Sequence, residues 1–147
     1  MAQGDILLFD EWVREMGEEI HDWSSDTIKL GLIDNTTPPT QADATPRWAD
    51  YVANEVGTGG GYPANGITLT SVTWTEAAGV GTLDAANVQL SQNASGFTDA
   101  YWGILYNDTA ASDQAIGFVE LGGPVSEVAG PVNINWNGSG ILTITRS

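Results

Sequence analysis

Apolar and polar residues alternate along the C-terminal stretch 131–145, whose sequence is PVNINWNGSGILTIT. A period of two is the strand period, because successive side chains leave opposite faces of a pleated backbone. The Asn and Gly residues of segment 137–140 tolerate the positive φ of a turn. If the two apolar runs share a face, the loop between them has an odd number of residues, either 137–139 or 137–141. The pattern predicts a β-hairpin with one buried face.

A helical period occupies the N-terminal segment 5–22. Its apolar residues recur at spacings of three and four, which places them in one stripe: Ile6, Phe9, Val13, Met16 and Ile20. Acidic residues crowd its second half, where the helix dipole disfavours them, so the helix depends on packing rather than on propensity. Leu8 and Trp12 lie beside the stripe and either widen the buried face or contact a second chain. We expect one long N-terminal helix.

Strand patterns follow, separated by clusters of Gly, Asn, Asp and Ser. They predict strands over 27–33, 67–75, 80–90, 100–106 and 115–121. Within 67–75 the apolar phase changes near Thr70-Ser71. The change indicates either a bulge or a strand that crosses between two sheets.

The segments between these strands carry turn and helix signals. The Pro-rich segment 34–45 predicts a loop. Thr45-Pro46 predicts a short helix over 46–56, with Thr45 as N-cap, Pro46 at the first helical position, and Trp48 and Val52 facing inward. The Gly-rich segment 57–66 only loosely has the spacing of a nucleotide-binding loop, and a Thr-rich strand rather than a helix follows it. We therefore expect a plain turn there.

Together these elements define a fold class. We expect a mainly β protein: an antiparallel β-sandwich or barrel-like domain of about six to eight strands with one N-terminal α-helix. The length of 147 residues suits a single domain, with the helix in residues 1–25 and the sandwich in residues 27–147.

Charge narrows the choice of partners. The chain has 19 acidic residues and four basic ones, Arg14, Lys29, Arg47 and Arg146, for a net charge of −15. Such a surface repels phosphate groups, so we expect neither nucleic-acid nor membrane binding. No apolar run approaches the roughly 20 residues of a membrane span, and the acidic N-terminus does not resemble a secretory signal. Cysteine is absent, which excludes disulfides and thiolate chemistry.

Candidate catalytic and metal-binding residues are few. His21 is the only histidine, and we expect it at the surface or as a cap at the helix end. Glu76 and Glu120, both on predicted strands, are the best carboxylate pair for a glycosidase. The chain lacks the G-x-S-x-G motif of a serine nucleophile. The residues thus predict no enzyme activity and no cofactor.

Oxygen-rich segments offer ligands of the kind that calcium prefers. They are Asp34-Asn35, Asn107-Asp108 and Asp113. No twelve-residue ligand loop contains them, so we expect no metal site.

Several stretches, in order along the chain, resemble a family of small virion structural proteins of tailed bacteriophages. They are residues 21–33 (HDWSSDTIKLGLI), 51–59 (YVANEVGTG), 66–69 (GITL), 101–109 (YWGILYNDT) and 136–144 (WNGSGILTI). The resemblance implies a non-enzymatic particle component, a capsid decoration (cement) protein that binds and stabilises the outer surface of the head shell. A tail or neck protein is the nearby alternative, and the family carries no catalytic residues to transfer.

This resemblance also implies partners and a location. We expect the major capsid protein as a partner, self-association as a trimer, synthesis in the bacterial host cytoplasm and a final place on the capsid surface of the virion. Buried aromatic residues dominate interface energies, so the predicted interface is Phe9, Trp12, Val13, Met16 and Trp23. The competing reading of each is ordinary core packing. Two other functions stay open: a carbohydrate-binding β-sandwich module, suggested by six tryptophans, and a hydrolase that uses Glu76 and Glu120.

Overall fold

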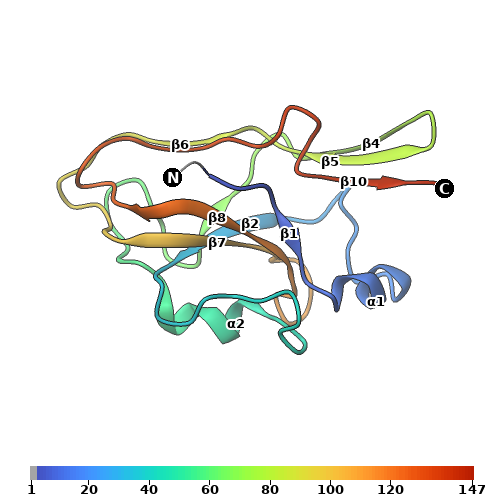
Figure 1. Cartoon of the computed structure of the whole chain (residues 1–147), viewed down its shortest axis with the longest axis horizontal. Coiled ribbons are helices and arrows are strands. Elements are labelled where there is room, and N and C mark those ends of the chain that lie inside the picture. Colours follow the sequence, from blue (N-terminus) through green and yellow to red (C-terminus); the bar gives the residue numbers. More distant parts are fainter. Residues whose placement is uncertain (1–2) are drawn as a thin grey trace.

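The computed structural model describes residues 3–147 and is mainly β, with antiparallel sheets and a short N-terminal helix, as predicted. It has three layers: a long ribbon above, a five-stranded sheet in the middle, and α2 with a loop below (Figure 1). Ten strands are described, more than predicted: β1 (Leu7–Leu8), β2 (Ile28–Ile33), β3 (Ile67–Thr68), β4 (Thr73–Ala77), β5 (Val80–Asp84), β6 (Val88–Leu90), β7 (Ala100–Asn107), β8 (Ala115–Val125), β9 (Val132–Ile134) and β10 (Leu142–Thr145). The helices are α1 (Trp12–Gly17), α2 (Trp48–Tyr51) and the 3-10 turn η1 (Val52–Asn54).

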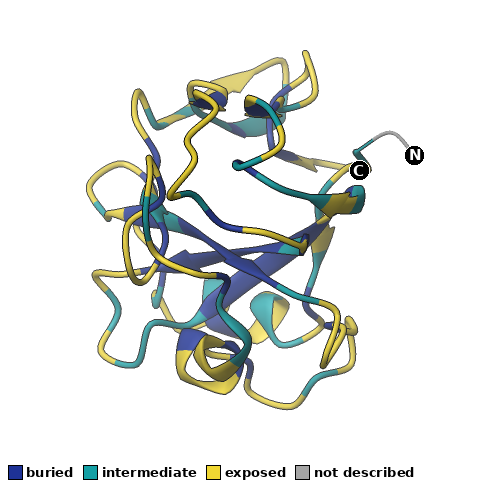
Figure 2. Cartoon of the chain, turned by 90° about the vertical axis from the view of Figure 1, so that its left-hand side faces the viewer, coloured by how far each residue is buried: buried dark blue, intermediate teal, exposed yellow. Residues whose placement is uncertain are grey.

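The middle sheet has the order β1-β8-β7-β2-β3, and each pair in it is antiparallel. Its central strands are buried on both faces, which explains their nearly continuous apolar sequences. One face packs against the upper ribbon and forms the larger core. The other face packs against α2 through a smaller aromatic core that includes Phe9, Trp48, Tyr51 and Phe118. Figure 2 shows the buried residues gathered in these strands and the exposed ones in the surrounding loops.

The predicted C-terminal hairpin is wrong. β9 pairs with β6 and β10 pairs with β5, so the two strands lie end to end along segment 80–90 rather than side by side (Figure 1). The turn at Asn137 exists, because Gly140 N donates to Asn137 O at 2.8 Å, but it bulges out and returns the chain to its former direction. Alternation identified both strands correctly, but it carries no information about which strand pairs with which.

The predicted strand 67–75 does cross between two sheets. β3 belongs to the middle sheet, whereas β4 belongs to a three-stranded sheet of order β10-β5-β4. Ser71 adopts a positive φ of 54° between them, which turns the chain and shifts the apolar phase. Leu69 can therefore stay in the core between the middle sheet and the upper ribbon, and Trp74 packs against the same core from the upper sheet.

The long helix predicted over 5–22 is wrong. Its first part is the edge strand β1 and its second part is the six-residue α1. Gly4 N donates to Glu120 O at 2.9 Å and Phe9 N donates to Ile116 O at 3.2 Å, so this segment pairs with the edge of β8. Pairing with the open edge of β8 satisfies backbone N–H and C=O groups of this segment. A helix with so many acidic residues has little intrinsic stability, so the edge strand is preferred. Met1 and Ala2, the start of the predicted region 1–25, lie outside the described residues.

The short helix after Pro46 begins later than predicted. Its N-cap is Arg47, whose N–H donates to the Asp50 carboxylate at 2.9 Å, and Thr45 is not the cap. Trp48 faces inward as expected and stacks on Tyr106, with ring centroids 5.2 Å apart. Val52 does not face inward, since η1 follows and leaves it 38% exposed; Tyr51 is the second buried residue. Loop 34–45 and the Gly-rich turn 57–66 are irregular, as predicted.

Candidate attachment surface

Three tryptophans from distant parts of the sequence meet at the end of the molecule where α1 lies. Trp12 of α1 stacks on Trp23 with centroids 5.8 Å apart and an interplanar angle of 7°. Trp74 of β4 meets Trp23 edge-on at 4.8 Å. Offset stacking and edge-to-face contact are the favoured geometries of aromatic pairs. The cluster therefore joins α1, the segment before β2 and the upper three-stranded sheet.

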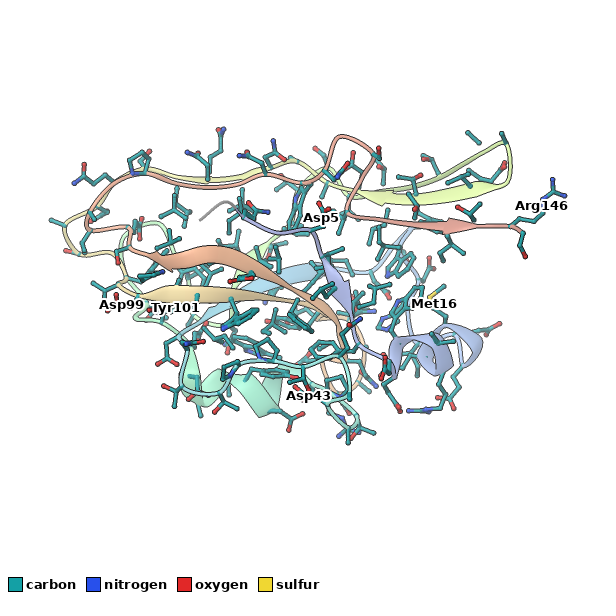
Figure 3. The ribbon with its side chains drawn as sticks, viewed as in Figure 1. Asp5, Met16, Asp43, Asp99, Tyr101 and Arg146 are labelled. Carbon is teal, nitrogen blue, oxygen red and sulfur yellow. The ribbon has the colours of Figure 1, made fainter. Side chains whose placement is uncertain are left out.

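An open hollow of about 440 Å³ lies against this cluster. It is lined by Met16, Glu19, His21, Trp23, Ser24 and Trp74, together with Asp22. The Met16 side chain points from α1 towards the three-stranded sheet (Figure 3). The wall is aromatic and thioether, and acidic residues lie at the rim. Such a surface suits a partner that brings an apolar side chain.

The acidic rim is held by its own loop. The two oxygens of the Asp22 carboxylate accept hydrogen bonds from Ser24 N at 3.0 Å and Ser25 Oγ at 2.9 Å. These bonds, that of Ser25 first, lower the pKa of Asp22. Asp22 is thus ionised at neutral pH and fixes the turn that presents Trp23.

The predicted interface residues divide by exposure. Phe9 is 1% exposed and Trp23 is 4% exposed, so both are occupied within this chain. Trp12 and Met16 are half-buried and pack against the core. Val13 is 70% exposed and precedes Met16 by one helical turn. The structure brings Trp12, Met16 and Trp23 together; contact of any of the five with a partner stays a prediction.

A buried polar network holds this end of the molecule in place. His21 is buried, which corrects the expectation of a surface position. Its Nε2 lies 3.0 Å from Glu15 Oε2, and its Nδ1 lies 3.1 Å from Asn107 Nδ2. Asn107 also donates to Asp26 Oδ2 at 2.6 Å. Because the amide Nδ2 is a donor, His21 Nδ1 must be the acceptor and Nε2 carries the proton towards Glu15.

The carboxylates considered for catalysis lie on different sheets. Glu76 is on β4, where its Oε1 accepts from Gly79 N at 2.7 Å and caps the β4–β5 turn. Glu120 is on β8 of the middle sheet. A glycosidase needs two carboxyl groups flanking one bond. Neither Glu76 nor Glu120 lines the hollow beside Trp23.

Three of the candidate calcium ligands already have protein partners. Asp34 accepts from Thr36 N, Asn35 accepts from Trp102 Nε1, and Asp108 lies 3.0 Å from Lys29 Nζ. Within residues 3–147, no group of three or more His, Asp or Glu side chains is arranged to hold a metal ion.

The chain matches no known protein family, no curated protein and no solved structure. In the part of the chain that the structure describes, no helix has the length and apolar character needed to cross a membrane.

Sequence reasoning missed Trp74 as a wall of the hollow. The signal was present, since the phase change at Thr70-Ser71 separates Trp74 from the apolar face of β3 and sends it to another sheet. It also missed the partly exposed Trp102, which lies on a strand whose other residues are nearly all buried.

Proposed function

We propose that this protein is a non-enzymatic virion structural protein, a capsid decoration protein that binds the outer surface of a phage head and stabilises the shell. The ordered sequence resemblance supports the family. The observation that carries the attachment role is the hollow beside α1, which is open to solvent and is lined by the partly exposed Met16 and Trp74 against the buried Trp23. Val13, exposed on the preceding turn of α1, extends this surface.

The proposed partner is the major capsid protein, and the proposed assembly is a trimer at a symmetry axis of the shell. An apolar contact at α1 agrees with interfaces in which a few buried aromatic and Met side chains supply most of the binding energy. Glu19 and Asp22 lie at the rim of this contact, and the other acidic residues give the remaining surface a negative charge that keeps particles apart.

Cryo-electron microscopy of the parent particle tests this function. We expect density for the chain on the outside of the head, with α1 against the shell. Density confined to the tail or neck would refute the decoration role and identify a tail or neck protein instead. Absence of the chain from the virion would refute any structural role in the particle. The carbohydrate-binding alternative predicts signals on a glycan array, which a decoration protein without receptor duties does not give.

A further inference from the structure

The lower layer leaves part of the middle sheet uncovered. Trp48 and Tyr51 of α2 cover the lower face around Ile33 and Tyr106. Towards the β1 edge a groove of about 450 Å³ remains open. Its lining includes Leu7, Pro39, Gln41, Trp102, Phe118 and Glu120.

The walls of this groove are fixed before any ligand binds. Trp102 Nε1 donates to Asn35 Oδ1 at 3.0 Å, which sets the plane of the indole ring. Phe118 packs edge-on against Trp102, with centroids 6.0 Å apart and an interplanar angle of 70°. Leu7 is 48% exposed beside them. A preorganised aromatic wall binds without the entropy cost of ordering its side chains.

The negative charge of Glu120 favours a cationic ligand in this groove. Glu120 stands directly opposite Trp102 in the pairing of β7 with β8, so the carboxylate and the indole are neighbours on one face. Glu120 is exposed and belongs to none of the ion pairs found in residues 3–147. Two basic residues are already paired, Arg14 with Glu11 and Glu18 and Lys29 with Asp108. The other two, Arg47 and Arg146, form no ion pair with Glu120 within residues 3–147 either. Glu120 is therefore open to a cation from another molecule.

We propose that this groove binds an arginine side chain from an extended segment of a partner polypeptide. The guanidinium stacks on Trp102 and pairs with the Glu120 carboxylate, while its aliphatic stem lies along Leu7 and Phe118. Arginine suits this role better than lysine, because its planar group both stacks on an aromatic face and bonds a carboxylate through two parallel N–H groups. The site lies on other elements than the hollow beside α1 and does not depend on the proposed function.

A titration of the ¹⁵N-labelled protein tests the proposal. The probe is the peptide acetyl-Gly-Leu-Arg-Gly-amide, and its matched control replaces Arg with citrulline, which has the same shape without the charge. We expect the Arg peptide to shift the Trp102 indole N–H signal saturably and to bind roughly tenfold more tightly than the citrulline peptide. Binding should weaken as salt is added.

Two variants assign the effect to Glu120. Glu120→Gln should reduce affinity for the Arg peptide roughly tenfold, to the level of the citrulline peptide. Glu76→Gln makes the same charge change on β4 and should leave affinity unchanged, because Gln keeps the oxygen that accepts from Gly79 N. Equal binding of the two peptides, equal effects of the two variants, shifts centred on α1, or no response at roughly 10 mM peptide would each overturn the proposal.

Other occupants give different results. Maltotriose shifting the Trp102 signal while the Arg peptide does not would assign the groove to a carbohydrate and refute the arginine site. Shifts of the same signal on raising the protein concentration alone, with dimers in sedimentation velocity, would assign it to a second copy of the chain and refute the proposal equally.

Discussion

Asn107, at the end of β7, donates its amide to the ring of His21 at 3.1 Å, and this contact ties the segment after α1 to the middle sheet. The amide cannot turn over, because its oxygen accepts from Thr109 N at 3.0 Å and Ala110 N at 3.2 Å. One side chain thus fixes the β7–β8 turn and the position of His21 at the same time. Trp23, two residues beyond His21, takes its place in the aromatic cluster as a consequence.

Asn107→Ala should destabilise the fold strongly. It leaves His21 Nδ1 without a partner in a buried region, at a cost of roughly 1–3 kcal/mol, and it also frees the two N–H groups of the partly buried turn. Urea unfolding should show a lower free energy of unfolding with an unchanged slope. Asn133→Ala, on the exposed side of β9, is the control and should have little effect. Equal stability of the two variants would mean that the network carries no net stability.

Val13→Asp tests the attachment surface without disturbing the fold. Val13 is 70% exposed, so the substitution should leave the free energy of unfolding within about 0.5 kcal/mol of the wild type. If α1 contacts the shell, burying a new carboxylate there should weaken binding to purified capsids at least roughly tenfold. Val52→Asp makes the same change on η1, away from α1, and should bind normally. Co-sedimentation with capsids measures both variants, and equal binding by the two would exclude α1 from the interface.

Gly96→Ala should disturb the buried Glu127. This carboxylate is fully buried and accepts from Gly61 N at 2.7 Å, which fastens the Gly-rich turn to the loop after β8. A Cβ at Gly96 would lie 2.5 Å from Glu127 Oε2, so the carboxylate must move. We expect a loss of roughly 1–3 kcal/mol and a lower Tm in calorimetry.

Gly57→Ala, in the Gly-rich turn 57–66, is the matched control for Gly96→Ala. A Cβ at Gly57 meets no atom within 4 Å, so the change should be neutral or slightly stabilising through the unfolded state. A Gly96→Ala protein as stable as Gly57→Ala would show that Glu127 can relax away from the turn.

Sequence periodicity predicted the position of a strand where the burial of that strand alone explains its pattern. It failed where the structure depends on which segments pair with each other. β2, β7 and β8 were predicted closely, because their apolar residues are buried on both faces of the sheet. The apolar residues of segment 5–22 have a helical period, yet its first part is a strand. Pairing with β8 and the packing of Phe9 on Phe118, with ring centroids 5.2 Å apart, stabilise that strand. β9 and β10 were found as strands but given the wrong partners, since alternation says nothing of residues fifty positions away.

The candidate site shows the same division. Trp12, Met16 and Trp23 could be selected from sequence as large apolar residues near the N-terminus. Their convergence depends on Trp74, which reaches them only because the chain turns at Ser71, and on Asn107, which fixes His21. Contacts across such sequence distances leave no local pattern.

Alkaline pH should unfold this protein through its buried tyrosines. Burial raises the pKa of Tyr51, and its hydrogen bond to Asp43 raises it further; burial likewise raises the pKa of Tyr62 and of Tyr106. A group whose pKa is higher in the folded state contributes stability that is complete below its unfolded pKa of about 10 and is lost as pH rises above it. Each such tyrosine lowers the free energy of unfolding by about 1.4 kcal/mol per pH unit in that window.

Tyr51→Phe isolates one of these contributions. Between pH 7 and 9 the variant should differ from the wild type by a constant amount, the cost of losing the 2.8 Å hydrogen bond to Asp43 Oδ2. Above pH 10 its free energy of unfolding should fall less steeply than that of the wild type, by about 1.4 kcal/mol per pH unit, because one fewer tyrosine ionises on unfolding. Urea unfolding at closely spaced pH values measures both slopes. Parallel curves above pH 10 would contradict the raised pKa of Tyr51 and show that its hydroxyl ionises as readily in the folded protein as in the unfolded chain.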